Sequence, residues 1–189
     1  MSTLDAIILI TSLIYVFLAT RENVWCWFWG IISCSLWAYA SFEGRLYADA
    51  FLQLFYVGIS FWGIYQWRGG HSQRGGALAV AELPIKWHLA ILIGGVLVSL
   101  PFGYFLKEYT YAAATYLDSV TTVFAIITTF MVARKILSNW LYWIVIDLVY
   151  VYLYSIREMQ TQAWIMIIYI GIAILGYFQW RKKMLSQTV

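Results

Sequence analysis

Residues 56–68 read YVGISFWGIYQWR, and residues 169–181 read YIGIAILGYFQWR. Seven of these thirteen positions are identical, at a constant offset of 113 residues. A match this short can arise by chance in an apolar chain, so the register outside the stretch decides whether the sequence is an internal repeat.

The same offset continues toward the N-terminus without a gap. It pairs further identical residues, namely Asp5 with Asp118, Phe17 with Phe130, Arg21 with Arg134, and Trp27 with Trp140. The first three apolar segments are therefore repeated as the last three, and one segment between them serves as a linker. Because four crossings separate equivalent positions, we expect two parallel repeats related by an axis along the membrane normal.

The composition excludes a soluble domain. Of the 189 residues, 63% are hydrophobic and only 11% are charged, whereas soluble domains carry about 25% charged residues. A membrane span uses about 20 residues. Seven apolar segments of that length are present, at about 4–20, 24–42, 46–67, 88–106, 116–133, 138–155 and 161–180. We expect an all-α membrane protein whose seven transmembrane helices form a 3+1+3 parallel repeat.

The domain division follows from this pattern. Residues 1–68 form a first three-helix bundle, 69–115 a linker with the fourth helix, and 116–189 a second bundle with a tail. The Gly-rich tract at 69–76 is interpreted as a flexible linker, because no Gly-Lys-Ser/Thr follows it. Residues 1–5 lack a basic region, so we expect no cleaved signal peptide.

The two cysteines are predicted to be buried thiols. Cys26 and Cys34 lie eight residues apart in one apolar segment. Helical rise separates them by about 12 Å, which is too far for a disulfide.

The basic residues predict the orientation. Connections on the side of the N-terminus hold three Lys or Arg, and those on the other side hold nine, including Arg21, Arg134 and Lys183. The positive-inside rule therefore places the C-terminus in the cytoplasm and the N-terminus outside. Acidic residues gather at the outer ends, among them Asp49 and Asp118, and we expect them to attract a cation at the entrance.

Polar side chains form stripes along several of the predicted helices. Asn139, Trp143, Asp147 and Tyr150 follow each other at spacings of 4, 4 and 3, which places them on one helix face. A carboxylate near the middle of a span, such as Asp147, costs about 2.5–3.5 kcal/mol on insertion scales unless it is compensated. The other stripes supply the remaining candidates for substrate contact, namely Gln53, Tyr56, Trp29, Trp37 and Thr122.

Each stripe also has a purely structural interpretation. Tryptophans near span ends are typical of interfacial belts, an interpretation that applies to Trp25, Trp67, Trp87 and Trp180. Membrane threonines commonly bond within their own helix, and glycines allow close helix packing. These interpretations cover Thr121, Thr122, Thr128, Thr129, Gly58, Gly63, Gly171 and Gly176, while His71 and His88 are expected to be solvated. A structural hydrogen-bond network could account for Asp147, Asn139 and Gln53.

Motifs of catalysis and metal binding are absent from the sequence. There is no His-Glu-x-x-His, Cys-x-x-Cys, Gly-x-Ser-x-Gly or phosphate-loop lysine. We therefore expect no enzyme activity, no metal, no cofactor and no nucleic-acid partner. No energy-coupling motif is visible either, which favours a facilitator over a pump.

Three stretches resemble the PnuC family of bacterial vitamin transporters. They are LYADAFLQ at 46–53, WGIYQW at 62–67, and RKILSNWLYW at 134–143. The resemblance covers nearly the whole chain and implies a 3+1+3 bundle similar to the SWEET sugar transporters. It also implies facilitated diffusion across the bacterial inner membrane, with the vitamin trapped by a cytoplasmic kinase. Separately, a homo-oligomer is compatible with the sequence.

The resemblance points to Gln53, Tyr56, Asn139 and Trp143 as substrate contacts. Members carry nicotinamide riboside, thiamine or riboflavin. The short chain and the motif at 116–143 resemble the thiamine branch, and Thr129 stands where some nicotinamide riboside carriers have Gln. These features slightly favour thiamine, with nicotinamide riboside as the alternative. A non-transporting sensor or assembly subunit is the competing class.

Either vitamin suits the polar stripes. Thiamine and nicotinamide riboside are flat, permanent cations, and a Trp face attracts such a cation by about 0.5–2 kcal/mol. Asp147 would offset the positive charge, and the amides of Asn139 and Gln53 could both donate and accept hydrogen bonds. A phosphorylated vitamin would be repelled by the same acids.

Overall fold

The computed structural model describes residues 3–43, 47–69, 78–109, 115–156 and 158–187. These residues form seven helices and an isolated β-bridge between Ala81 and Ile136. The helices are α1 (Thr3–Thr20), α2 (Trp25–Glu43), α3 (Tyr47–Trp67), α4 (Ile85–Tyr109), α5 (Thr115–Ala133), α6 (Asn139–Ile156) and α7 (Gln160–Ser186). The expectations for the linker at 70–76, for His71, and for Arg45, Arg74 and Arg157 lie outside the described residues.

The predicted all-α fold with seven helices is confirmed. By length and composition, α1, α4, α5, α6 and α7 are apolar enough to cross a membrane. The helices α2 and α3 have a similar length, and their Trp, Tyr, Ser and Gln residues lower their mean hydropathy. A helix satisfies all its internal backbone hydrogen bonds, which is what a lipid environment requires of a spanning segment.

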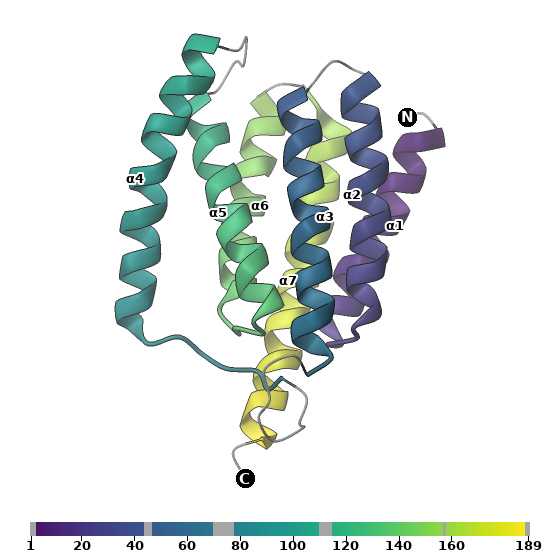
Figure 1. The fold of residues 1–189 in the computed structure, drawn as a ribbon, viewed down its shortest axis with the longest axis vertical. Coiled ribbons are helices and arrows are strands. Elements are labelled where there is room, and N and C mark those ends of the chain that lie inside the picture. The colour runs from purple at the N-terminus through teal and green to yellow at the C-terminus, as the bar shows by residue number, and fades with distance from the viewer. Residues whose placement is uncertain (1–2, 44–46, 70–77, 110–114, 157, 188–189) are drawn as a thin grey trace.

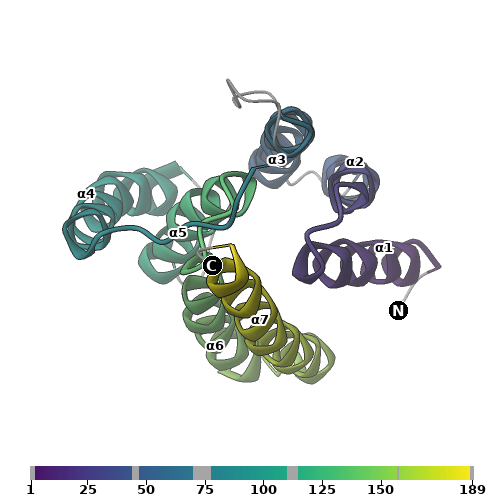
Figure 2. The same cartoon turned by 90° about the horizontal axis from the view of Figure 1, so that it is seen from below.

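Six of the helices form a closed ring. Viewed along the bundle, they follow the order α1, α2, α3, α5, α6 and α7, and α7 returns to α1 (Figure 2). Both α1 and α5 begin at the same end of the bundle and run the same way (Figure 1). The two three-helix repeats are therefore parallel, as predicted. The contact of α3 with α5 and the contact of α7 with α1 are equivalent joints between them.

The fourth helix, α4, lies outside the ring against α5 (Figure 2). Its contact face requires small residues. At Gly95, an added Cβ would lie 2.6 Å from the Phe124 ring, so a larger side chain would not fit. One turn on, the Ser119 hydroxyl donates a 2.6 Å hydrogen bond to the Ser99 carbonyl oxygen. A small residue at every fourth position lets two membrane helices approach closely, so these contacts hold α4 to the second repeat.

The side chain of His88 is half-buried rather than solvated. Its Nδ1 atom lies 3.1 Å from the Tyr142 hydroxyl, and the two rings stack at 5.9 Å. The prediction failed because a residue next to a linker in the sequence is held against α6 by the packing of α4 in space.

Four tryptophans form the core at the end of the bundle where the chain's C-terminus lies. Trp27, Trp67, Trp140 and Trp180 are all buried, and their rings meet edge to face or tilted at 5.3–6.0 Å. The belt prediction was therefore wrong for Trp67 and Trp180. The sequence places both next to an arginine at a span end, but the ring of helices turns them inward against the opposite repeat.

The buried indoles of Trp67 and Trp180 cross between the repeats. Trp67 Nε1 donates hydrogen bonds of 3.3 and 3.1 Å to the carbonyl oxygens of Val132 and Ala133. Trp180 Nε1 donates a 3.0 Å hydrogen bond to the carbonyl oxygen of Ala19. Ala19 and Val132 occupy equivalent positions at the offset of 113, so each repeat makes the same bond to the other.

Glycine at two of the four predicted packing positions makes room for this core. A Cβ on Gly63 would lie 2.4 Å from the Trp27 ring, and one on Gly176 would lie 2.7 Å from the Trp140 ring. Within the described part of the chain, a Cβ on Gly58 or Gly171 would meet nothing within 4 Å. The packing prediction is thus confirmed for Gly63 and Gly176 and wrong for the other two.

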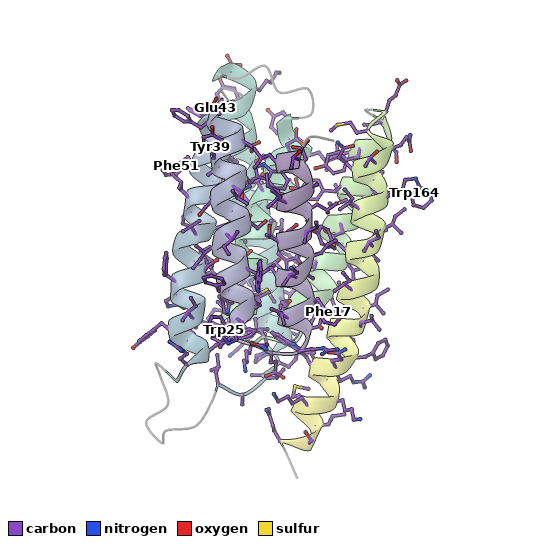
Figure 3. The ribbon with its side chains drawn as sticks, turned by 90° about the vertical axis from the view of Figure 1, so that its right-hand side faces the viewer. Phe17, Trp25, Tyr39, Glu43, Phe51 and Trp164 are labelled. Atoms are coloured by element: carbon purple, nitrogen blue, oxygen red, sulfur yellow. The ribbon has the colours of Figure 1, made fainter. Side chains whose placement is uncertain are left out.

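The outer surface of the bundle is rich in exposed aromatic and aliphatic side chains. Phe51 and Trp164 point away from the helices toward one end, while Trp25 lies near the other (Figure 3). Trp25 is 60% exposed and Trp87 is 55% exposed, in agreement with the predicted belt. Such a surface suits lipid.

Candidate functional site

The centre of the bundle contains a buried carboxylate. Asp147, on α6, is only 6% exposed. It lies within electrostatic range of Tyr169 on α7, whose hydroxyl donates a 2.8 Å hydrogen bond to Ser12 Oγ on α1. Tyr169 and the Ser12 hydroxyl bonded to it therefore bring polar groups of α7 and α1 toward the carboxylate, and such groups compensate part of the cost of burying a charge.

A second group of hydroxyls adjoins this carboxylate. Tyr150, one turn along α6, lies within electrostatic range of Asp147 and shares a hydrogen bond with Thr121 on α5. Tyr56 on α3 lies within electrostatic range of Tyr150 and of Cys34 on α2. With Tyr15 on α1, which lies within electrostatic range of Tyr56 and Cys34, every helix of the ring contributes to this polar centre.

Aromatic rings border the polar centre on the side of the tryptophan core. Tyr56 and Trp143 are partly buried and pack against that core from opposite repeats. On the other side of Asp147, toward the end of α6, Tyr150 and Tyr154 stack at 5.8 Å with nearly parallel planes. Aromatic rings on both sides of a carboxylate suit the binding of a flat organic cation.

Asn139 lies at the start of α6, farther from the polar centre than its stripe suggests. Its side-chain amide donates a 2.6 Å hydrogen bond to the Ile136 carbonyl oxygen and is fully buried. Its Oδ1 atom has no hydrogen-bond partner among the described residues. The side chain thus closes the turn between α5 and α6 and keeps one acceptor unused.

The two predicted entrance acids lie together at the opposite end of the bundle from the tryptophan core. Asp49 is exposed at the start of α3, and it lies within electrostatic range of the half-buried Asp118 at the start of α5. Two carboxylates so placed create a negative potential at this end.

The remaining candidates are distributed around the ring. Gln53, Trp29 and Thr122 are half-buried, and Trp37 is exposed. Trp29 contacts Phe28 edge to face at 6.1 Å. Their contact with a substrate stays a prediction.

The structural interpretation of the threonines is partly confirmed. The hydroxyls of Thr121, Thr128 and Thr129 each donate to a carbonyl oxygen three or four residues earlier in α5. Thr121 has a second role, since it also bonds Tyr150 on α6.

Sequence reasoning missed four residues of the polar centre, namely Ser12, Tyr15, Cys34 and Tyr169. The repeat contains the signal for Tyr169, because it occupies the position equivalent to Tyr56 at the offset of 113. Ser12 and Tyr15 are three residues apart and share a helix face. Cys34 is a free, half-buried thiol rather than a fully buried one, whereas Cys26 is free and buried as predicted.

In the described ranges, no group of three His, Cys, Asp or Glu residues is arranged to hold a metal ion. The polar centre instead combines one carboxylate with hydroxyls and aromatic rings, which suits binding of an organic molecule.

Comparisons with known proteins identify relatives over nearly the whole length. The nicotinamide riboside transporter PnuC of Escherichia coli (strain K12) is 24% identical over 205 residues, covering 95% of this chain and 85% of that protein. The nicotinamide riboside transporter PnuC of Neisseria mucosa is 24% identical over 192 residues, covering 96% of this chain and 73% of that protein.

The fold has a counterpart among solved structures. A crystal structure of the vitamin B3 transporter PnuC matches with a TM-score of 0.78 and 23% identity, covering 97% of this chain and 82% of that one. The family model described as nicotinamide mononucleotide transporter matches residues 2–182. Because this model spans nearly the entire sequence, the chain belongs to the nicotinamide mononucleotide transporter family, the family of the PnuC membrane transporters.

Proposed function

We propose that this protein carries nicotinamide riboside across the membrane. One observation supports this most strongly: Asp147 is a buried carboxylate that lies within electrostatic range of the hydroxyls of Tyr150 and Tyr169. The full-length relatives named above are nicotinamide riboside transporters, and a pyridinium riboside is a flat cation that carries hydroxyl groups.

Each part of such a substrate has a counterpart among the described residues. The Asp147 carboxylate offsets the positive ring, and the indole face of Trp143 attracts it. The hydroxyls of Tyr56 and Tyr150 can bond ribose hydroxyls, as can the amide of Gln53. In this proposal the Asn139 Oδ1, which has no partner among the described residues, accepts a hydrogen bond from the substrate.

The outer candidates have a different part in the proposal. Asp49 and Asp118 attract the cation to the entrance and exclude phosphorylated vitamins. Trp37 and Thr122 line the path between the entrance and the polar centre, and Trp29 lies beyond the centre, toward the tryptophan core. The repeats at 1–68 and 116–189 move relative to one another, and the segment at 69–115 joins them.

Thiamine is the second candidate, although the full-length relatives found are named for nicotinamide riboside and lend it no support. The observation in its favour is Thr129, which is buried and bonded to the Ala125 carbonyl oxygen, and so offers no amide to a ribose. Thiamine has no ribose but carries an aminopyrimidine, and the Asn139 and Gln53 amides could bond that ring.

Transport is proposed to proceed by facilitated diffusion. A cytoplasmic kinase would phosphorylate the vitamin and trap it, so uptake into cells should depend on the kinase while uptake into vesicles should not. The protein would lie in the bacterial inner membrane with its C-terminus in the cytoplasm, singly or as a homo-oligomer.

Purified protein in liposomes tests the proposal. We expect radiolabelled nicotinamide riboside to equilibrate across the membrane without an ion gradient, and unlabelled nicotinamide riboside to compete better than thiamine. Stronger competition by thiamine would transfer the assignment to the second candidate. Vesicles that stay impermeable to both vitamins would favour a sensor or assembly subunit instead.

Reporter fusions test the orientation separately. A fusion after Ser186 should be active only as a cytoplasmic reporter, because nine of the twelve basic residues lie on that side. Activity of a periplasmic reporter at the same position would reverse the assignment.

A further inference from the structure

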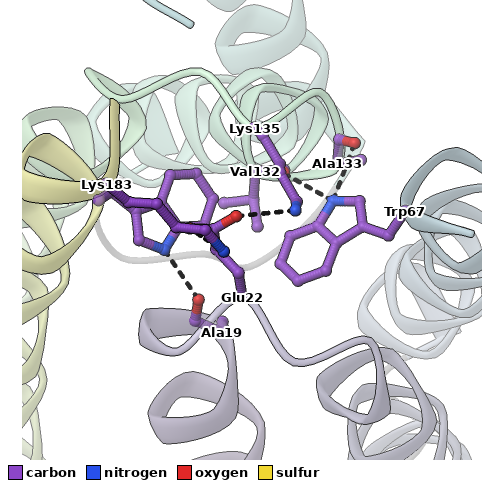
Figure 4. A network of polar contacts seen from close by, with 8 residues as sticks. Ala19, Glu22, Trp67, Val132, Ala133, Lys135 and Lys183 are labelled. Carbon is purple, nitrogen blue, oxygen red and sulfur yellow. Dashed lines mark hydrogen bonds and ion pairs between the residues drawn. The ribbon is translucent and has the colours of Figure 1, made fainter. Parts of the chain in front are cut away.

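Beneath the tryptophan core lies a buried ion pair that the polar centre does not use. Lys135 Nζ lies 2.8 Å from Glu22 Oε2, and both side chains are almost completely buried (Figure 4). Lys183 of α7 approaches the other carboxylate oxygen at 3.1 Å, with its own side chain 51% exposed. One carboxylate thus lies between two ammonium groups contributed by the second repeat.

The two members of the pair occupy equivalent positions in the two repeats. Glu22 and Lys135 are separated by the repeat offset of 113 residues. Each lies in the turn after the first helix of its repeat, with left-handed backbone at φ 52° and φ 51°. Two equivalent points can touch only at the axis that relates the repeats, so this pair lies on the axis.

The neighbouring contacts of Lys135, Trp67 and Trp180 also cross between the repeats. Lys135 Nζ lies 4.8 Å from the centre of the Trp67 ring. Trp67 and Trp180 bond carbonyl oxygens of the opposite repeat, and their rings meet at 6.0 Å. The repeats are therefore closed upon one another at the end where the C-terminus lies.

The two equivalent residues of the pair carry opposite charges. Its neighbours Arg21 and Arg134 are identical in the two repeats, and both are exposed. Two identical charges at position 22 and its equivalent would repel each other on the axis. An acid opposite a base attracts instead, so the difference between the repeats at this position turns the axis into a closed joint.

A buried ion pair is suited to a joint that opens and closes. Its attraction in the closed state is set against the desolvation of both groups, and water that enters on opening restores their hydration. The pair therefore orients the closed state without making opening prohibitively costly. Removing one partner has a different effect, because the other charge is left buried and uncompensated.

The Lys135 side of the joint is anchored to the linker. The Ala81 amide donates a 3.0 Å hydrogen bond to the Lys135 carbonyl oxygen, and the Leu137 amide donates a 2.8 Å hydrogen bond to the Ala81 carbonyl oxygen. The turn that carries Lys135 is thus fixed to the segment leading into α4, and opening would carry Glu22 away from it.

We infer that the Glu22–Lys135 ion pair is the gate that closes the substrate path at the end of the C-terminus, and that it breaks once in each transport cycle. This inference rests on the proposed transport function. It assigns both residues a positioning role, since neither lies at the polar centre that would hold the vitamin.

The native thiol of Cys34 provides a probe of the gate. Cys34 lies within electrostatic range of Tyr56 and Tyr15 at the polar centre, beyond the gate. In a Cys26→Ser background it is the remaining cysteine. Its reaction with a charged, membrane-impermeant thiol reagent can be measured in vesicles of either orientation.

The variants Glu22→Gln and Lys135→Gln should raise labelling from the side of the C-terminus by about tenfold, because loss of a buried pair shifts the population toward the open state. The exchange Glu22→Lys with Lys135→Glu, made together with Lys183→Gln so that the new lysine does not face a second ammonium group, should return labelling toward the wild-type rate. Lys183→Gln and Arg21→Gln are controls that keep the central pair, and we expect less than about a twofold change for these more exposed groups.

Unchanged labelling in both single variants would overturn the inference. An equal increase from both sides would also overturn it, since that is what a loosened fold produces. The experiment needs no vitamin, so its result is separate from the substrate assignment. If the variants open on one side only and the protein does not take up nicotinamide riboside, the gate is supported and the substrate is wrong. If the protein takes up nicotinamide riboside and labelling is unchanged, the substrate is supported and the gate is wrong.

Discussion

The two repeats agree at the closed end and differ at the centre. At the closed end Trp27, Gly63 and Trp67 correspond to Trp140, Gly176 and Trp180, and each makes the same contact as its counterpart. At the centre Gly30, Cys34 and Trp37 correspond to Trp143, Asp147 and Tyr150. A two-fold joint needs equal surfaces on both sides, whereas an asymmetric ligand needs unequal ones. The tryptophan core therefore retains the repeat, whereas the centre retains it in Tyr56 and Tyr169 and loses it between α2 and α6.

The largest effect is expected from breaking the shared joint. Trp180→Ala removes a completely buried indole that bonds the opposite repeat, and Trp→Ala changes of this kind cost about 3–5 kcal/mol of stability. The midpoint of thermal unfolding, followed by size-exclusion chromatography of the detergent-solubilised protein, should fall steeply. Trp25→Ala, at an exposed position, is the control. Similar midpoints for the two variants would show that Trp180 is not part of the joint.

A smaller loss is expected from crowding the joint. Gly63→Ala and Gly176→Ala each place a methyl group less than 3 Å from an indole ring, and overpacking of this kind costs about 1–3 kcal/mol. Gly58→Ala and Gly171→Ala are matched controls on the same helices, where the added methyl group has room. If all four variants unfolded at the same temperature, close packing at Gly63 and Gly176 would not contribute to stability.

The difference between the repeats at the centre is tested by removing the charge of Asp147. Asp147→Asn preserves the shape and removes the charge, and should weaken binding of nicotinamide riboside by about 1–3 kcal/mol, the scale of a hydrogen bond to a charged group. Cys34→Ser, at the equivalent position of the first repeat, should have little effect. Titration calorimetry with the vitamin and with an uncharged analogue separates the contribution of the charge to the binding free energy from that of shape and hydrogen bonding. If both ligands weaken equally, Asp147 is not the counter-charge, and Asp49 and Asp118 become the candidates.

The smallest effect is expected from removing one aromatic face. Trp143→Ala should weaken binding by about 0.5–2 kcal/mol, the range of a cation–π contact, while its equivalent in the first repeat is already the glycine Gly30. Trp143 is only partly buried against the core, so its loss should lower the unfolding midpoint less than the loss of Trp180 does. A large fall in the midpoint with unchanged affinity would make Trp143 a packing residue.

The candidate site was partly predictable because helical spacing alone places residues on a face. Asp147, Trp143 and Tyr150 were found in this way, and so was Tyr56. Tyr169 was missed because no stripe of polar residues surrounds it, although its equivalence to Tyr56 was present in the repeat. Asn139 was placed on the right helix, but a stripe does not show that its amide is used by the neighbouring turn.

By itself, the sequence determined the seven helices, their parallel repeats and the face of α6 that carries the carboxylate. It could do so because apolar length, constant offset and helical period are local or periodic properties of the chain. Only the tertiary structure decided that Trp67 and Trp180 are buried, that His88 meets Tyr142, and that Glu22 pairs with Lys135. These contacts join residues far apart in the chain, and their geometry depends on how the ring of helices closes around its axis.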